Sequence, residues 1–270
     1  MEITKQEFEA YLCIAISSND GVYEKVQPHF EAYYDECKAS VLGSAGTQSV
    51  ESSTMPLCNV VKNWVSLRAF LGVFRQLDLV LTPTGFGVVS TNQMAPASKQ
   101  RVDALIGQLR DNALSIHGRL LEELCKVSDW GQSDQARENI DTLFFDFRLL
   151  QKMQGPATSH LEWQTAQRLI GEADEALRLK ISNQYMDHLL DAVRCNNASA
   201  DDNAVIFLCR KIINLWVYGD KESVKLKMRR LLNMLDANLE SYSIYAEHGY
   251  PVNHHENFKN TEDAPAYVFG

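Results

Sequence analysis

Apolar residues recur at three-to-four spacing along most of the chain, a pattern typical of amphipathic helices. In the first half it predicts helices over residues 4–17, 19–41, 57–77, 98–124 and 133–150. The third of these is apolar on every face, which predicts a central buried helix. Pro28 should kink the second or delay its start, and Gly118 is a candidate break in the fourth. Residues 43–56 are rich in Gly, Ser and Thr and are expected to form a loop.

The second half continues the pattern over residues 159–177, 182–193, 205–217 and 221–245. Gln154-Gly155-Pro156 interrupts it and is the expected boundary between two helical bundles, residues 1–154 and 157–248. Residues 196–202 are polar and are expected to form a loop. Side chains that can satisfy free amide groups mark several helix starts. These are the capping boxes Thr4/Glu7 and Ser159/Glu162 and the single caps Ser98, Ser133 and Ser182.

The stretch over residues 79–97 lacks the helical period. Residues 79–82 and 86–89 are extended-type segments on either side of Pro83-Thr84-Gly85, which predicts a short β-hairpin inserted into the first bundle. A two-stranded hairpin is marginally stable alone, so we expect it to need a partner surface. The predicted fold class is therefore mainly α, with one projecting hairpin.

Two of the most apolar segments resemble each other. Residues 57–65 read LCNVVKNWV and residues 208–217 read LCRKIINLWV, with one gap between them. This similarity suggests that the two bundles arose by internal duplication. Chance similarity between two buried helices is the alternative.

Composition excludes several classes of protein. The net charge is −9 and no block of Lys or Arg occurs, which argues against sequence-specific DNA binding. An acidic wall could still let DNA slide past without sticking. The six cysteines are scattered without a CxxC pair, which indicates synthesis in a reducing cytoplasm. We expect neither a signal peptide nor a membrane span, because the N-terminus lacks a leader pattern and no run of eighteen apolar residues occurs.

No catalytic or cofactor motif is predicted. Gly85-Phe86-Gly87 resembles part of a phosphate-binding loop, but Val88 and Val89 continue an extended run where such a loop needs a helix. Ser98 with Lys99 resembles a nucleophile beside a lysine, yet the SxxK spacing would require lysine where Arg101 stands.

Histidine and tryptophan offer weaker candidates. His248, His254, His255 and Glu256 gather near the C-terminus and could bind a metal, although solvated tail residues explain them better. Three tryptophans could line a ligand cleft, but core packing is the favoured interpretation. They are Trp64, Trp163 and Trp216. We therefore predict no metal, cofactor or catalytic residue.

The last segment, residues 249–270, has no helical period and is expected to be an extended C-terminal arm. It is polar and then ends in the apolar residues Tyr267, Val268 and Phe269. An apolar tip on an extended arm tends to dock in a groove or on a sheet edge, often of a neighbouring subunit. A disordered end is the alternative.

Residues 81–89, LTPTGFGVV, and 95–102, APASKQRV, resemble a motif of an uncharacterised Bacteroidales family associated with phage and prophage structural modules. A helical bundle with a projecting loop and a C-terminal arm is also similar in style to phage head–tail connector (adaptor) proteins. The resemblance implies a homo-oligomeric ring between portal and tail or neck proteins, with loops or arms inserted into neighbours. It implies no catalytic residues.

We therefore expect a virion structural protein, made in the bacterial host cytoplasm, that acts as a head–tail connector or neck ring component. DNA would at most pass through its lumen. The alternative is a cytoplasmic helical scaffold or peptide-binding protein without enzymatic activity. The expected interaction residues are Thr82, Pro83, Thr84, Gly85, Phe86, Val88 and Val89 in the hairpin, and Tyr267, Val268 and Phe269 in the arm.

Overall fold

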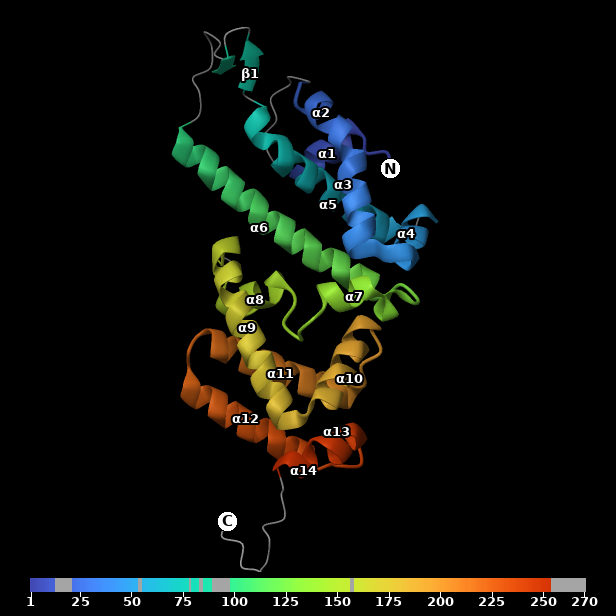
Figure 1. The fold of residues 1–270 in the computed structure, drawn as a ribbon, viewed down its shortest axis with the longest axis vertical. Helices are drawn as coiled ribbons and strands as arrows, with labels where there is room; N and C mark the ends of the chain where they lie inside the picture. Colours follow the sequence, from blue (N-terminus) through green and yellow to red (C-terminus); the bar gives the residue numbers. More distant parts are fainter. Residues whose placement is uncertain are drawn as a thin grey trace, which may run out of the picture. The chain divides into compact units, whose positions relative to one another are not determined.

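The computed structural model is mainly helical, as the periodicity predicts (Figure 1). It describes residues 1–12, 21–52, 55–77, 79–82, 85–88, 98–155 and 158–253. The chain forms two compact units. The first comprises Met1–Ala166 with Arg194–Asn196, and the second comprises Gln167–Val193 and the chain from Asn197 onward.

The boundary between the units lies within helix α9 (His160–Ile181), not at Gly155-Pro156 as the sequence predicts. The first turn of α9 belongs to the first unit because its side chains pack there. The ring of Trp163 meets that of Phe147 edge-on at 6.0 Å. The backbone amide of His160 donates to Asp111 Oδ1 at 2.6 Å. Contacts between distant segments therefore determine the boundary, and the capping signal in the sequence does not report such contacts.

Along the chain, the first unit consists of helices and short helical turns that precede and follow one pair of strands. Its elements before the strands are α1 (Lys5–Leu12), α2 (Gly21–Val26), the 3₁₀ turn η1 (Gln27–His29), α3 (Phe30–Cys37), the π turn η2 (Lys38–Leu42), α4 (Gly43–Glu51), α5 (Met55–Val73) and the 3₁₀ turn η3 (Phe74–Gln76). Those after the strands are α6 (Lys99–Leu124), the 3₁₀ turn η4 (Trp130–Gln132), α7 (Asp134–Asn139) and α8 (Phe147–Gln154).

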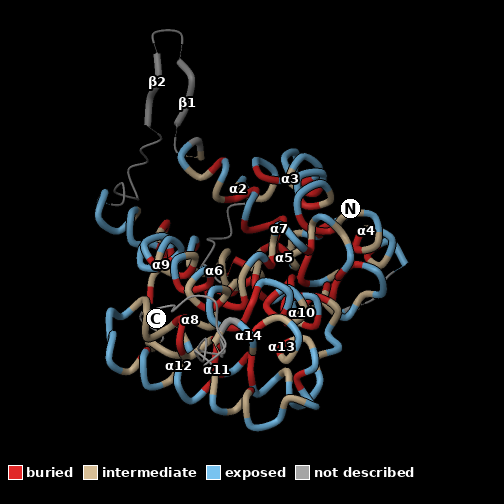
Figure 2. The backbone as a smooth tube through the Cα atoms, turned by 60° about the horizontal axis from the view of Figure 1, so that its bottom comes forward, coloured by how far each residue is buried: buried red, intermediate tan, exposed pale blue. Residues whose placement is uncertain are grey.

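Helix α5 is the centre of this unit, which confirms the predicted buried helix. It packs against α1, α3 and α6, and most of its apolar residues are buried, as the burial colours of the backbone show (Figure 2). On one side Phe70 joins a cluster of aromatic rings, in which Phe8 lies 5.7 Å from Phe30 and 6.3 Å from Phe70. Burial of large rings contributes most of the stability of such a small core.

Pro28 separates α2 from α3 through turn η1, so the predicted kink is confirmed. The loop predicted over residues 43–56 is wrong, because Gly43–Glu51 forms helix α4. Gly46 lies against Leu124, where an added Cβ would come within 2.9 Å of the leucine side chain. Val50 is buried on the same helix. Tertiary packing thus outweighs the low helix propensity of this stretch.

Helix α6 runs without a break through Gly118. Ser98 has the extended backbone of an N-cap residue, but its hydroxyl makes no capping bond, so only its position was predicted correctly. The helix predicted over residues 133–150 is two helices, α7 and α8. The second starts because Asp146 Oδ1 accepts a hydrogen bond from the amide of Arg148 at 2.8 Å.

Strands β1 (Leu79–Thr82) and β2 (Gly85–Val88) pair antiparallel. Leu79 lies opposite Val88, and Thr82 lies opposite Gly85. No third strand joins this sheet in the described part of the chain.

The described part of the second unit contains the rest of α9 and five further helices. These are α10 (Asn183–Arg194, whose last residue belongs to the first unit), α11 (Ala200–Val217), α12 (Lys221–Asp236), α13 (Ser243–His248) and α14 (Tyr250–Asn253). The single helix predicted over residues 221–245 is wrong. The chain leaves α12 at Asp236 and folds back, because Tyr245 packs on Tyr185 at 6.0 Å and its hydroxyl donates to Asp236 at 2.8 Å. A short helix, α14, occupies the start of the predicted extended arm.

Both predicted capping boxes are present. The carboxylate of Glu7 accepts from the amide of Thr4 at 2.8 Å, and that of Glu162 accepts from the amide of Ser159 at 2.7 Å. A third box opens α11 within the predicted loop over residues 196–202, where Ser199 pairs with Asp202. The sequence pattern missed it because aspartate stands where the usual box has glutamate.

Glu7 links the first capping box to the core, since its other oxygen pairs with Lys62 of α5 at 2.7 Å. The hydrogen bond from Lys62, followed by that from the backbone of Thr4, holds the pKa of Glu7 below its ordinary value of 4.5. A depressed carboxyl pKa stabilises the fold above the unfolded-state pKa, and this stability is lost as the pH falls through the folded-state value.

We expect Glu7→Gln to lower the free energy of unfolding by about 1 kcal/mol at pH 7 and by much less at pH 3. Urea denaturation at pH 7, 5 and 3 measures the difference. Glu9→Gln is the matched control, because Glu9 lies on the same helix at 4.0 Å from Lys5 in an exposed pair. If Glu7→Gln lowered the free energy of unfolding equally at pH 7 and pH 3, the stabilising role of the ionised Glu7 carboxylate would be contradicted.

Candidate binding site

A pocket with a volume of about 510 Å³ opens in the first unit among α3, α5, η3 and α6. Three arginines and one tyrosine line it together with apolar side chains. The lining residues are Tyr33, Arg68, Leu71, Gly72, Phe74, Arg75, Ile106 and Arg110. Its volume lies within the range of small-molecule pockets, and its lining is mixed, because four of the eight residues are arginine or tyrosine. We call it the arginine pocket.

Helical spacing brings the three cations to this one place. Arg68, Gly72 and Arg75 follow each other at intervals of four and three residues, so they lie on one face of α5 and η3. Ile106 and Arg110 are four residues apart on α6, which packs against α5. The pocket is therefore a product of the α5–α6 packing that also forms the core.

Arg68 is held in place by two neighbours. Its Nη2 lies 2.6 Å from Glu36 Oε1, and its guanidinium lies 5.4 Å from the centre of the Trp64 ring. Arg75 and Arg110 are exposed and form no ion pair with any carboxylate in the described residues. The arginine pocket thus holds more positive charge than its own acidic neighbours neutralise.

Tyr33 approaches the backbone of α5 closely. A Cβ atom added at Gly72 would lie 1.9 Å from the Tyr33 hydroxyl oxygen. Glycine at this position therefore lets the hydroxyl reach the wall of the pocket, where it can donate or accept a hydrogen bond.

Burial lowers the pKa of His117 on α6, against an opposing effect of Asp146. His117 is consequently neutral at pH 7 and adds no charge. The positive potential of the pocket comes from its arginines.

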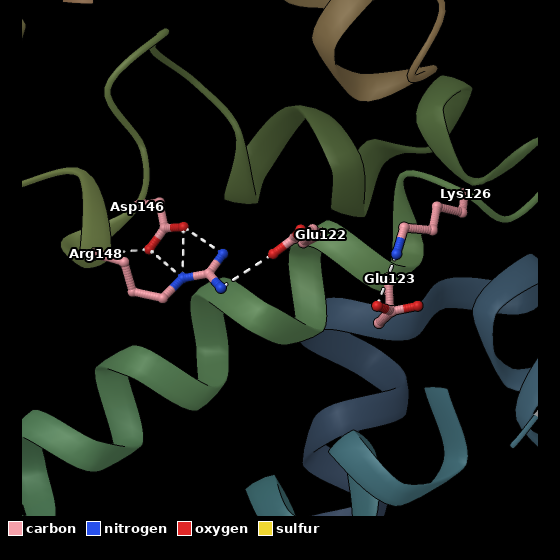
Figure 3. Close-up of polar contacts among 5 residues, drawn as sticks. All are labelled: Glu122, Glu123, Lys126, Asp146 and Arg148. Carbon is pink, nitrogen blue, oxygen red and sulfur yellow. Dashed lines mark hydrogen bonds and ion pairs between the residues drawn. The ribbon is translucent and has the colours of Figure 1, made fainter. Parts of the chain in front are cut away.

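A second polar cluster lies where α6 meets α8 (Figure 3). Arg148 donates to both oxygens of buried Asp146, with Nη2 to Oδ2 at 2.6 Å, and its Nη1 reaches Glu122 at 3.0 Å. Lys126 pairs separately with Glu123 at 2.7 Å. Every charge in this cluster has a partner inside the cluster, so we assign it to folding rather than to ligand binding.

Within the described residues, no group of three His, Cys, Asp or Glu side chains could hold a metal ion. The five described cysteines are free. Burial raises the pKa of Cys37, Cys125 and Cys209 to about 12, so these thiols stay protonated at neutral pH. None of the described helices combines the length and the apolar character that crossing a membrane requires.

Among the predicted interaction residues, Thr82 and Gly85 face each other across the strand pair, and Phe86 and Val88 follow in β2. Six others lie outside the described residues. These are Pro83, Thr84, Val89, Tyr267, Val268 and Phe269. The sequence predicts no metal site, and of the four C-terminal residues considered as metal ligands only His248 is described. It lies 3.8 Å from the carboxylate of Glu247.

The core interpretation of the tryptophans is confirmed for Trp64 and Trp163, each 6% exposed. Sequence reasoning missed the three arginines of the pocket. The available signal was Arg68 and Arg75, which are seven residues apart and therefore lie on one face of the helix predicted over residues 57–77.

Residues 22–140 match a family described as "Family of unknown function (DUF6712)". The matched segment contains every residue of the arginine pocket and both strands. Neither the curated proteins nor the solved structures contain a match to this chain.

Proposed function

We propose that this chain is a virion structural protein that assembles into a homo-oligomeric ring, as a head–tail connector or neck component between portal and tail. The observation that carries the proposal is the two-stranded sheet β1–β2, which no third described strand completes. Unpaired strand edges favour pairing with another chain, and a pair of strands gains stability from it. A neighbouring subunit would supply that partner.

Two further features support this role. The resemblance of residues 81–89 and 95–102 to a phage structural motif covers the same strands and the approach to α6. The net charge of −9 suits a ring whose lumen lets DNA pass without binding it. The ring would be made in the host cytoplasm and carried in the virion.

In this proposal the work of the protein is assembly. The hairpin insertion from Thr82 to Val89 adds its edge to a neighbour, and the arm residues Tyr267 to Phe269 dock on an adjacent protein. The two bundles derive from one duplicated unit, and the hairpin is elaborated only in the first. No bond is made or broken.

Native mass spectrometry of the full chain, alone and with portal and neck proteins, tests the proposal. We expect Phe86→Lys/Val88→Lys to abolish the ring, because lysines on an edge strand oppose strand addition. Ala104→Lys/Gln108→Lys is the matched control. It adds the same charge at two exposed positions of α6 and should leave the ring intact.

Normal assembly of the β2 double variant would remove the hairpin from the proposal. A wild-type chain that stays monomeric with every portal and neck protein of its own genome would remove the connector role itself.

The alternative function, a helical scaffold or peptide-binding protein, is favoured by the arginine pocket. A monomer that binds foreign acidic peptides in this pocket and never enters a particle would establish that alternative.

A further inference from the structure

We propose that the arginine pocket binds an acidic peptide segment and that its occupant is the segment 262–269 of a second copy of this chain. The inference rests on the proposed assembly function, because it names the receptor for the arm that the ring requires.

The charge of the pocket sets the first requirement. Guanidinium groups bind carboxylates through two parallel hydrogen bonds, which gives both strength and orientation. Arg68 already has Glu36 at 2.6 Å, whereas Arg75 and Arg110 have no carboxylate partner among the described residues. The pocket therefore matches a ligand with two carboxylates close together.

The apolar wall sets the second requirement. Leu71, Phe74 and Ile106 line the pocket beside the arginines, so a ligand that also carries apolar groups gains from burial there. Free phosphate offers no such groups. A nucleic acid would meet repulsion from a chain of net charge −9. A peptide that combines carboxylates with apolar residues satisfies both requirements.

The chain itself contains a segment of this chemistry. Glu262 and Asp263 are adjacent carboxylates, Ala264 and Pro265 follow at once, and two aromatic residues come next at Tyr267 and Phe269. The proline favours an extended backbone before it, so less order is lost when the segment docks.

The second copy follows from the geometry of rings. The arm leaves the second unit after Asn253, whose side-chain amide donates to the carbonyl of Lys180 at 2.6 Å. The pocket belongs to the first unit. The arm and the pocket are thus different surfaces of the chain, which makes a contact between two copies heterologous. Heterologous contacts form a ring when the rotation between copies closes, as the proposed ring requires.

Peptide binding to the full chain provides the first test. The variant Glu262→Gln/Asp263→Asn/Tyr267→Ala/Phe269→Ala keeps the length of the chain but leaves the pocket free of its own arm. We expect a fluorescent peptide of residues 258–270 to bind it saturably in an anisotropy titration, and more weakly as salt rises.

Adding Arg75→Gln/Arg110→Gln to this protein should weaken binding about tenfold or more. Arg101→Gln/Arg119→Gln is the matched control, since both are exposed on α6 outside the pocket, and it should change nothing. A peptide with Glu262→Gln/Asp263→Asn should bind the unaltered pocket more weakly by the same factor. On the pocket with Arg75→Gln/Arg110→Gln, the peptide substitutions should weaken binding little further.

Mixing two full-length variants tests the second copy. A tagged chain with Arg75→Gln/Arg110→Gln keeps its arm, and an untagged chain with the four arm substitutions keeps its pocket. Both also carry the β2 substitutions Phe86→Lys/Val88→Lys, so the hairpin cannot link them. We expect purification through the tag to recover the untagged chain as well. Recovery should stop when one of the two proteins carries both the pocket and the arm substitutions.

Several results would overturn the inference. They are no peptide binding, binding that ignores the pocket substitutions, displacement of the peptide by millimolar inorganic phosphate, and an arm that binds only its own pocket. If the chain is nevertheless a component of particles, the proposed function stands and only this inference fails. If the peptide binds as expected but the chain is absent from particles, the pocket keeps its ligand and the proposed function fails.

Discussion

Trp130→Ala is expected to lower the free energy of unfolding of the first unit by about 3–5 kcal/mol. The side chain is fully buried at turn η4, and its indole Nε1 donates to the carbonyl of Val41 at 3.0 Å. The substitution opens a cavity and also leaves that carbonyl without its partner. Urea denaturation followed by circular dichroism measures the loss.

Trp130→Phe separates the two contributions. It retains most of the ring volume but removes the N–H donor, so we expect a loss of about 1–3 kcal/mol. Trp216→Ala is the control, because Trp216 lies in the second unit and is only partly buried. If Trp130→Ala cost no more than Trp130→Phe, the packing of this ring would not organise the unit.

Gly118→Ala is expected to destabilise the first unit by about 1–3 kcal/mol, although alanine normally stabilises a helix relative to glycine. A Cβ at this position would lie 2.2 Å from Asp146 Oδ1 and 2.9 Å from Arg148 Nε. Both groups are fixed by their mutual ion pair (Figure 3). Relief of the clash must therefore separate a largely buried carboxylate from its guanidinium.

Gly107→Ala is the matched control on the same helix. An added Cβ there meets only His160 at 3.8 Å, an ordinary contact. We expect this substitution to raise the free energy of unfolding by about 0.5–1 kcal/mol. Thermal denaturation compares the stabilities of the two variants with that of the wild-type protein. A higher stability for Gly118→Ala would show that the Asp146–Arg148 ion pair can move at little cost.

The helices could be predicted wherever one local pattern decides the outcome. The apolar faces of α5 and the boxes at Thr4 and Ser159 are such cases. Prediction failed where distant contacts decide. Gly43–Glu51 is helical where Gly46 packs against Leu124, and Tyr245 packs on Tyr185 after α12 ends at Asp236. The spacing of apolar residues within one segment does not predict either of these contacts.

The candidate site shows the same limit. Arg68 and Arg75 share a face by helical spacing, which the sequence contains. Arg110 joins them only because α6 packs on α5, and the role of Gly72 depends on Tyr33 from α3. Periodicity can identify a face but not what meets it, so the pocket emerges from the fold.

The proposed role as a virion component is tested most directly by quantitative mass spectrometry of purified, DNA-filled particles encoded by the same genome. We expect the chain to be present at a fixed number of copies per particle, comparable with the portal protein, and to stay through a high-salt wash. Its absence from such particles, while it is abundant in the lysate of the same cells, would contradict that role.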